Sequence, residues 1–247
     1  MVNRRIPQKL HFVWVGDDAL CPHNCIDSWR ELHPDFEIRL WGNADWKERP
    51  WRTRHHMDAI AATGQLCGVA DLMRWEILMD EGGMVLDADS VCLSRIPDWM
   101  FDCTAFASWE NEHAKPGLIA NGFFAAHPGD RLVARLVDTF VKTENLATRY
   151  IWYKLKHKRL ASWRTTGPLA LSEAYRSMNY TALTVLPSQF FMPKHYSGLR
   201  YEGDGPVICH QLFASTGTSG YQELLKLSAT EIRGYAMEDL INGGSNR

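Results

Sequence analysis

The sequence has no surplus of charge of either sign, since 27 Lys and Arg residues are balanced by 29 Asp and Glu residues, for a formal net charge of −2. A protein that binds nucleic acid usually carries a basic surplus, so we expect no nucleic-acid partner. Long apolar runs are also missing, because none approaches the ~18 to 20 residues that a membrane-spanning helix requires. The opening residues MVNRRIPQKL do not have the pattern of a secretory signal. We therefore expect a cytoplasmic protein, and peripheral contact with the inner face of a membrane stays open.

The six cysteines lack the setting in which disulfides form. Without a secretory signal, reduced thiols are expected. Cys21 and Cys25 are spaced like metal ligands, but no second pair follows at zinc-finger spacing. Internal repeats and low-complexity linkers are absent as well. A chain of 247 residues with 45% hydrophobic residues can form one full core, so we expect a single domain over residues 1–242 and a disordered tail at 243–247.

The most informative stretch runs from Gly68 to Leu93. It predicts an amphipathic helix over residues 68–80, a stop at Gly82 and Gly83, and a short apolar strand that leads into Asp87 and Asp89. The carboxyl end of such a strand is where open α/β sheets bind ligands. Alternate residues of an extended strand point to opposite faces, so both carboxylates reach one ligand only if the chain bends at Ala88. We therefore predict that the strand ends at Asp87.

Strand and helix patterns alternate along much of the chain. Residues 9–15 and 36–41 are rich in β-formers, and a helical pattern over residues 24–32 separates them. Such alternation predicts an α/β fold with a central, mostly parallel sheet flanked by helices. Residues 221–240 are predicted to form one closing helix.

Two polar positions interrupt or follow apolar runs. Asn121 and Gly122 interrupt the run from Leu118 to Ala126, where a ligand could approach the backbone closely, although a bulge or turn explains the pattern equally well. His210 follows a short strand pattern at residues 206–209. A lone histidine in that setting is ordinarily structural.

The pattern A-D-x-x-R at residues 70–74, followed by G-G-x-x-x-D-x-D at residues 82–89, resembles glycosyltransferase family 32, whose sugar-binding region contains a DXD motif. That family is related in its catalytic core to the glucosylating clostridial toxins. Further segments are similar to blocks of the family in the same order, namely residues 6–16, 28–42, 121–130, 166–171 and 210–216. The resemblance therefore covers nearly the whole chain.

The resemblance implies a GT-A-like fold and a divalent cation, Mn²⁺ or Mg²⁺, that offsets the charge of a leaving nucleoside diphosphate. The implied metal ligands are Asp87, Asp89 and His210. The implied catalytic residues are Asp71, Arg74, Asp87 and Asp89. The implied donor-binding residues are Val13, Trp14, Asp71, Arg74, Asp87 and Asn121. In this scheme the indole of Trp14 stacks on the base and Asp71 accepts hydrogen bonds from the donor sugar.

The function implied is that of a retaining hexosyltransferase that uses a nucleotide sugar, with UDP favoured over GDP. The acceptor would be a saccharide or a lipid-linked saccharide, in the synthesis of a bacterial surface polysaccharide or glycolipid. The chain departs from the family at Val85, where relatives often have an aromatic residue, and at Thr216, where many have tryptophan. The basic and aromatic stretch from Glu144 to Trp163 suits a solvated helix, an acceptor-facing surface or a membrane-facing surface.

Two other functions fit parts of the sequence. The run from Asp87 to Val91 matches the D-x-D-x-T/V motif of haloacid-dehalogenase-type phosphatases, in which Asp87 would be the nucleophile and Asp89 the acid/base. That class usually has its motif at the start of the domain, whereas here 86 residues precede it. A non-catalytic carbohydrate-binding module would account for the ten tryptophans but not for the clustered acidic residues.

Overall fold

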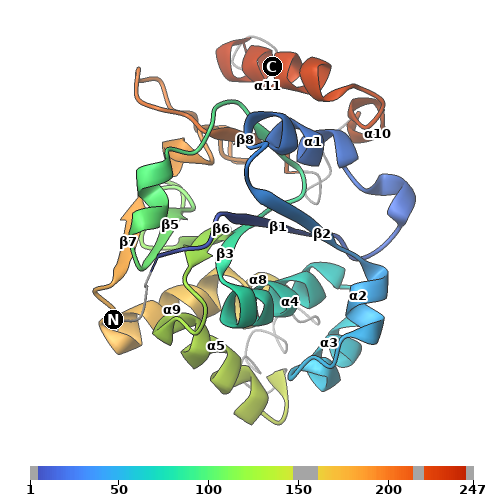
Figure 1. Cartoon of the computed structure of the whole chain (residues 1–247), viewed down its shortest axis with the longest axis vertical. Coiled ribbons are helices and arrows are strands. Elements are labelled where there is room, and N and C mark those ends of the chain that lie inside the picture. The colour runs from blue at the N-terminus through green and yellow to red at the C-terminus, as the bar shows by residue number, and fades with distance from the viewer. Residues whose placement is uncertain (1–4, 147–160, 214–219, 243–247) are drawn as a thin grey trace.

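A six-stranded sheet with the strand order β2-β1-β3-β6-β5-β7 forms the centre of the protein (Figure 1). The structure is a computed structural model that describes residues 5–146, 161–213 and 220–242. The sheet strands are β1 (Lys9–Val13), β2 (Glu37–Trp41), β3 (Gly83–Leu86), β5 (Ala105–Trp109), β6 (Ile119–Ala126) and β7 (Leu183–Leu186). A separate two-stranded sheet pairs β4 (Ser90–Cys92) with β8 (Cys209–Gln211).

The helices fill the connections between these strands. The α-helices are α1 (His23–Leu32), α2 (Asn43–Glu48), α3 (Arg54–Ala61), α4 (Leu66–Glu81), α5 (Arg131–Lys142), α8 (Ser162–Thr165), α9 (Pro168–Met178), α10 (Tyr221–Leu224) and α11 (Ala229–Asn242). Short 3-10 turns are η1 (Asp18–Leu20), η2 (Asp98–Asp102) and η3 (Ser188–Phe190). Among the described helices, none is long and apolar enough to cross a membrane.

The expectation of a mostly parallel sheet is confirmed. β1 is parallel to β2 and to β3, and β5 is parallel to β7. β6 lies between β3 and β5 and is antiparallel to both. One reversed strand therefore separates the two parallel groups, and the carboxyl ends of β1, β3 and β5 meet at one edge of the sheet.

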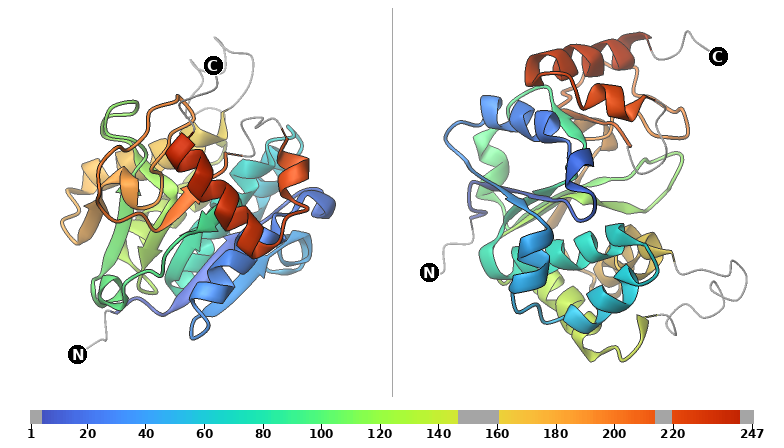
Figure 2. Two further views of the ribbon diagram at one scale, coloured as in Figure 1. Left: turned by 90° about the horizontal axis from the view of Figure 1, so that it is seen from above. Right: turned by 90° about the vertical axis from the view of Figure 1, so that its right-hand side faces the viewer.

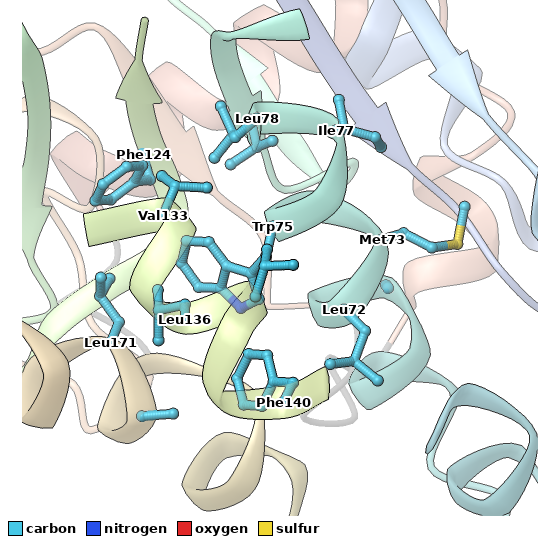
Figure 3. Packing of buried hydrophobic residues seen from close by; sticks show 14 of the residues in the cluster. Leu72, Met73, Trp75, Ile77, Leu78, Phe124, Val133, Leu136, Phe140 and Leu171 are labelled. Carbon is cyan, nitrogen blue, oxygen red and sulfur yellow. The ribbon is translucent and has the colours of Figure 1, made fainter. Parts of the chain in front are cut away.

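Helices cover both faces of the sheet, as Figures 1 and 2 show. On one face α4 is flanked by α3, α5 and α8, and its residues from Gly68 to Leu78 are all buried. Figure 3 shows Trp75 of α4 in the middle of this layer, where it packs edge-on against Phe124 of β6. Burial of a large apolar side chain stabilises a fold by roughly 1.5–3 kcal/mol. Helix α4 is thus a fixed platform for the polar residues that it carries.

The glycine pair after α4 ends that helix as the sequence predicts. Gly82 has a φ of 64° and Gly83 a φ of 91°, a region that other residues rarely adopt. A Cβ at Gly82 would also lie 2.6 Å from the Cδ atom of Pro128. The tight turn leads directly from α4 into β3, which pairs with β1 and β6 on either side.

The end of the described chain differs from the single helix predicted for residues 221–240. The structure has two helices, α10 and α11, because Ser228 starts a new one. The Ser228 hydroxyl accepts a hydrogen bond from the Glu231 N–H at 3.3 Å, and the Glu231 carboxylate accepts one from the Ser228 N–H at 2.8 Å. This reciprocal capping box is a helix-start signal in the sequence that the apolar pattern concealed. Helix α11 packs on α1 and the β4–β8 sheet, on the opposite side of the main sheet from α4.

Candidate active site

The two carboxylates after β3 are brought to one side of the chain by a turn. β3 ends at Leu86, one residue earlier than predicted, and Asp87 is held by its N–H, which donates to the Gly122 carbonyl at 2.9 Å. The Ser90 hydroxyl and N–H both donate to the Asp87 carbonyl, at 2.6 and 3.0 Å. The predicted bend at Ala88 is confirmed, because one side chain, that of Gln211, contacts the carboxylates of both Asp87 and Asp89.

Gly122 leaves the space that the Asp87 carboxylate occupies. A Cβ at position 122 would lie 2.5 Å from the Asp87 Cγ atom, a separation that real Cβ atoms essentially never show. Position 122 lies inside the continuous strand β6, so the asparagine–glycine pair is not a turn. The pairing of β6 with β5 does shift register across this pair, because Ala107 is opposite Phe124 and Trp109 is opposite Ile119, so the irregularity that the sequence left open as a bulge is present. The atoms that approach this glycine closely are those of the Asp87 carboxylate, just after β3, whereas the sequence predicted the approach of a ligand.

Arg74 and Asp71 of α4 extend the polar cluster into the helix layer. The Arg74 guanidinium donates a short hydrogen bond from Nη2 to the Asp87 carboxylate, and its Nη1 lies 3.6 Å from Asp71 Oδ1. Asp71 Oδ1 also accepts from the Asn121 amide at 2.6 Å, and Oδ2 accepts from the Thr166 hydroxyl at 3.0 Å. Each carboxylate oxygen of Asp71 therefore has a partner that fixes its direction.

Burial changes the acidity of this cluster. It raises the pKa of Asp71 to about 6, against the opposing effects of the Arg74 charge and of the Thr166 and Asn121 hydrogen bonds. A buried carboxylate with a raised pKa and fixed orientation is typical of functional sites. It is positioned by helix α4, by Asn121 of strand β6 and by Thr166 at the end of α8.

One cavity of about 720 Å³ joins these residues, a size typical of small-molecule and cofactor sites. The sequence-predicted residues that line it are Val13, Trp14, Asp71, Arg74, Asp87, Asp89 and Asn121. Val13 and Trp14 come from the carboxyl end of β1, and the Trp14 indole N–H donates to the Asp17 carbonyl at 3.0 Å. The structure thus gathers seven of the eight predicted site residues, while their individual roles stay predictions.

His210 is the predicted residue that the structure does not bring to the carboxylates. Its Nε2 atom is 2.9 Å from Asp239 Oδ2 on α11, and its side chain is not part of the cavity wall. Gln211, the next residue, lines the cavity instead, and its Nε2 donates to Asp89 Oδ1 at 2.7 Å and to Asp87 Oδ2 at 3.3 Å. Adjacent residues of a strand point to opposite faces, so the sequence interpretation was wrong by one position about which side chain faces the carboxylates.

Three cavity residues had no signal in the sequence. Glu110, after β5, and Lys115 both line the cavity, and burial, with the nearby Asp87 charge adding to it, raises the pKa of Glu110 to about 7. The His195 Nε2 atom is 3.9 Å from the Glu110 carboxylate, is buried, and has no hydrogen-bond partner among the described residues. The neighbouring Tyr196 lines the cavity and packs against Phe213. Their spacing along the chain follows no motif, and only the fold brings them together.

Three features named from the sequence fall wholly or largely outside the described residues. Residues 147–160 of the basic and aromatic stretch, Thr216, and the tail at 243–247 are among them. Trp163, at the described end of that stretch, lines the cavity and is 40% exposed. The Lys115 ammonium lies 5.9 Å from its ring centroid, which joins this end of the stretch to the cavity.

The carboxylate pair fits a hard divalent cation better than a transition-metal site rich in nitrogen or sulfur ligands. Among the described residues, no three His, Cys, Asp or Glu side chains form a metal-binding group. The carboxylates of Asp87 and Asp89 are instead joined by the amide of Gln211, whose Oε1 atom is buried without a hydrogen-bond partner in the described part of the chain. Carboxylate and amide oxygens are the ligands of Mg²⁺, Ca²⁺ and Mn²⁺, so the residues present fit the expected cation.

Solved structures with this architecture identify the fold. The UDP-bound glycosyltransferase domain of the YGT toxin superposes with a TM-score of 0.54 and 10% sequence identity, over 99% of this chain and 92% of that one. The PaToxG glycosyltransferase superposes with a TM-score of 0.51 and 13% identity, over 71% of each chain. The fold is GT-A. In this GT-A fold the cavity lies at the edge of the sheet where β1, β3 and β5 end.

Similar sequences occur in two larger proteins, while no protein-family model matches the chain. "Inositol phosphoceramide mannosyltransferase 3" of Schizosaccharomyces pombe is 28% identical over 177 residues, which are 69% of this chain and 41% of that protein. "Subversion of eukaryotic traffic protein A" of Legionella pneumophila is 23% identical over 165 residues, which are 54% of this chain and 25% of that protein. The chain thus matches less than half the length of either relative.

Proposed function

We propose that the protein is a metal-dependent, retaining glycosyltransferase that moves a hexose from a UDP-sugar to a saccharide or lipid-linked saccharide. The observation that carries this proposal is the shared cavity, whose wall contains the carboxylates of Asp87 and Asp89 beside the Asp71–Arg74 pair. A carboxylate pair at one end and a buried hydroxyl-binding group at the other suit the diphosphate and the sugar of one donor molecule.

The donor would lie along the edge of the sheet. The indole of Trp14, at the end of β1, offers a flat surface for the base. Asp87 and Asp89 would hold Mn²⁺ or Mg²⁺, which supplies positive charge to the departing diphosphate. Arg74 adds a second positive charge close to Asp87. Asp71 and Asn121, fixed by their mutual hydrogen bond, would bind the sugar hydroxyls.

Retention of the anomeric configuration is proposed to follow a front-face route. The Asp71 carboxylate is committed to Asn121 and Thr166, an arrangement suited to binding hydroxyls and not to attack on the anomeric carbon. The leaving phosphate would then take the proton of the acceptor hydroxyl on the same face. A β linkage formed from an α-linked donor, detected by NMR of the product, would contradict this route.

The acceptor side is proposed to lie near Glu110, Lys115 and Trp163. Trp163 and Tyr196 expose aromatic surface at the cavity, which suits stacking on a sugar ring. A glycolipid acceptor is supported by the name of the yeast relative, which specifies an inositol phosphoceramide. The proposed setting is the synthesis of a bacterial surface polysaccharide or glycolipid, with the enzyme in the cytoplasm or at the inner face of the membrane.

A thermal-shift screen of UDP- and GDP-sugars with Mn²⁺ tests the donor. Binding of a ligand to the folded state raises the apparent melting temperature by mass action, so UDP-sugars should stabilise the wild-type protein and leave an Asp87→Asn/Asp89→Asn variant unchanged. Transfer or slow hydrolysis of the stabilising donor then establishes catalysis. Release of phosphate from a general phosphatase substrate would favour the haloacid-dehalogenase alternative. Sugar binding without any metal-dependent turnover would favour a carbohydrate-binding module.

A further inference from the structure

We propose that Gln211, through its amide oxygen, is the third protein ligand of the divalent cation, and that His210 anchors the strand from its other side. This inference rests on the proposed function for the presence of a cation, but its test measures cation binding and not turnover.

The pairing of β8 with β4 determines which side chain faces the carboxylates. In the antiparallel register, Ser90 is opposite Gln211, and Val91 is opposite His210. Asp89 immediately precedes β4, and its carbonyl accepts from the Leu212 N–H at 3.1 Å. The carboxylate turn and Gln211 are therefore fixed to each other by backbone hydrogen bonds, and a shift by one residue would reverse the faces.

The amide of Gln211 has only one of its two polar atoms in use. Its Nε2 donates to both carboxylates, whereas Oε1 is buried and has no hydrogen-bond partner among the described residues. A buried polar atom without a partner costs about 1–3 kcal/mol. Rotation of the terminal amide by half a turn exchanges the two atoms and directs the oxygen towards the carboxylates. In that orientation the amide oxygen can bind a cation together with the two carboxylates, and the NH₂ group takes the position that Oε1 holds in this structure.

The distances agree with such a cation. The Gln211 amide position lies 2.7 Å from Asp89 Oδ1 and 3.3 Å from Asp87 Oδ2. Neighbouring ligands of an octahedral Mg²⁺ ion, each about 2.0–2.1 Å from the metal, lie about 3 Å apart. The Gln211 amide is thus already at the distance from each carboxylate that neighbouring ligands of one cation have.

His210 is held in a different cluster. Its Nε2 lies 2.9 Å from Asp239 Oδ2, and the Lys194 ammonium donates to both oxygens of the same carboxylate at 2.7 Å. The hydrogen bond with His210, together with Lys194, lowers the pKa of Asp239 to about 2, so this carboxylate stays ionised. We call Lys194, His210 and Asp239 the strand anchor. Its position explains why a histidine in this part of the chain need not bind metal.

If the third ligand is the amide oxygen of Gln211 and not the imidazole nitrogen of His210, the site is expected to prefer different metal ions. An imidazole ligand favours Mn²⁺ and the later transition metals over Mg²⁺, whereas a set of oxygen ligands suits Mg²⁺ as well as Mn²⁺. The wild-type protein should therefore bind Mg²⁺ and Mn²⁺ with similar affinity, and a histidine at position 211 should shift the preference towards Mn²⁺ and Co²⁺.

Titration of the full chain with MnCl₂, followed by electron paramagnetic resonance with Mg²⁺ competition, tests the proposal. We expect Gln211→Ala to weaken Mn²⁺ binding at least about 10-fold, as loss of a ligand-shell group typically does. The matched control is His210→Asn, the adjacent residue of the same strand, which should lower the melting temperature and leave the Mn²⁺ dissociation constant within about 2-fold. Gln211→His should restore binding and introduce a ¹⁴N coupling from directly bound imidazole that the wild type lacks.

The outcomes separate this proposal from the proposed function. Unchanged Mn²⁺ affinity in Gln211→Ala, or a ¹⁴N imidazole coupling in the wild type that disappears in His210→Asn, would overturn the role of Gln211. If Mn²⁺ binding depends on Gln211, Asp87 and Asp89 but no nucleotide sugar is bound or turned over, the inference stands and the glycosyltransferase proposal fails. Mn²⁺ binding that survives in Asp87→Asn/Asp89→Asn would overturn both.

Discussion

The two sides of the cavity differ in how completely the protein satisfies its own polar groups. On the α4 side, both oxygens of Asp71 have hydrogen-bond partners, and Arg74 is paired with Asp71 and Asp87, although its Nε atom is an exception. On the β8 side, two residues that line the cavity have a buried polar atom without a partner among the described residues. They are Gln211 (Oε1) and Tyr221 (Oη).

The difference indicates that the two sides of the cavity have different roles in ligand binding. Buried polar atoms are nearly always hydrogen-bonded, so a group of unpaired ones around a cavity marks a place where ligands complete the structure. The polar groups of the α4 side are held in place by other groups of the protein. This side therefore suits a part of the substrate that does not vary. In the proposed function, the β8 side would gain its partners from the cation and the acceptor.

The largest effect is expected when the negative charges of Asp87 and Asp89, which lie between the α4 side and the β8 side, are removed. Asp87→Asn/Asp89→Asn should lower kcat/KM for transfer by at least about 10³-fold, equivalent to about 4 kcal/mol of transition-state stabilisation. Steady-state transfer assays with a UDP-sugar at saturating Mn²⁺ measure this loss. Transfer that persists at near wild-type rate in the variant with a chelator present would remove the carboxylates from the mechanism.

A second test displaces the Asp87 carboxylate without changing it. Gly122→Ala places a Cβ 2.5 Å from Asp87 Cγ, so the carboxylate must move away from Arg74 and Gln211. Because small misplacements in an active site can cost about 10²-fold in rate, we expect a loss of that order. Gly234→Ala is the control, since a Cβ there meets nothing within 4 Å and it lies in α11. Equal activity of both variants would show that the position of Asp87 is not critical.

A third test removes one hydrogen bond from the α4 side of the cavity. Thr166→Val removes the hydroxyl that donates to Asp71 Oδ2 and leaves that buried oxygen unpaired. We expect the free energy of unfolding to fall by about 1–3 kcal/mol, as for other buried groups that lose their partner. Urea unfolding measures this change. The companion variant Gln211→Leu removes a residue with an unpaired atom and should cost less stability, and the opposite ranking would contradict the division between the two sides.

The smallest expected effect is a pH dependence of stability in the metal-free protein. The pKa of Glu110 is raised to about 7, so between pH ~4.5 and ~7 the folded state binds more protons than the unfolded state. The free energy of unfolding should therefore fall as the pH rises through this window, by on the order of 2 kcal/mol from Glu110 alone.

The raised pKa of Asp71, about 6, acts in the same direction over a lower pH range. Glu110→Gln should flatten the upper part of the curve, above pH 6, in denaturant titrations with EDTA present. A wild-type protein whose stability rises between pH 5 and 7 would contradict the assigned burial of Glu110.

The same two sides also separate what the sequence could predict from what it could not. The α4–β3 unit is encoded locally: a helix, a glycine stop and a strand place Asp71, Arg74 and Asp87 within 17 residues of one another. The β8 side depends on a pairing between Ser90 and Gln211, which are 121 residues apart. Nothing local fixes that register, so His210 and Gln211 could be distinguished only after the fold was known. Glu110 and His195 likewise meet only through the fold.

Through the strand anchor, helix α11 holds the strand that carries Gln211, although α11 is distant from the turn that carries Asp87 and Asp89. The Asp239 carboxylate on α11 contacts His210 Nε2, and Gln211, the next residue of β8, donates a hydrogen bond to the Asp89 carboxylate. A truncated protein that stops before residue 229 would keep every side chain of the α4 layer yet lose the brace behind β8. Shortened versions designed for crystallisation or fusion should therefore retain residues 229–242, because without them the protein would be expected to melt at a lower temperature although its α4 layer is intact.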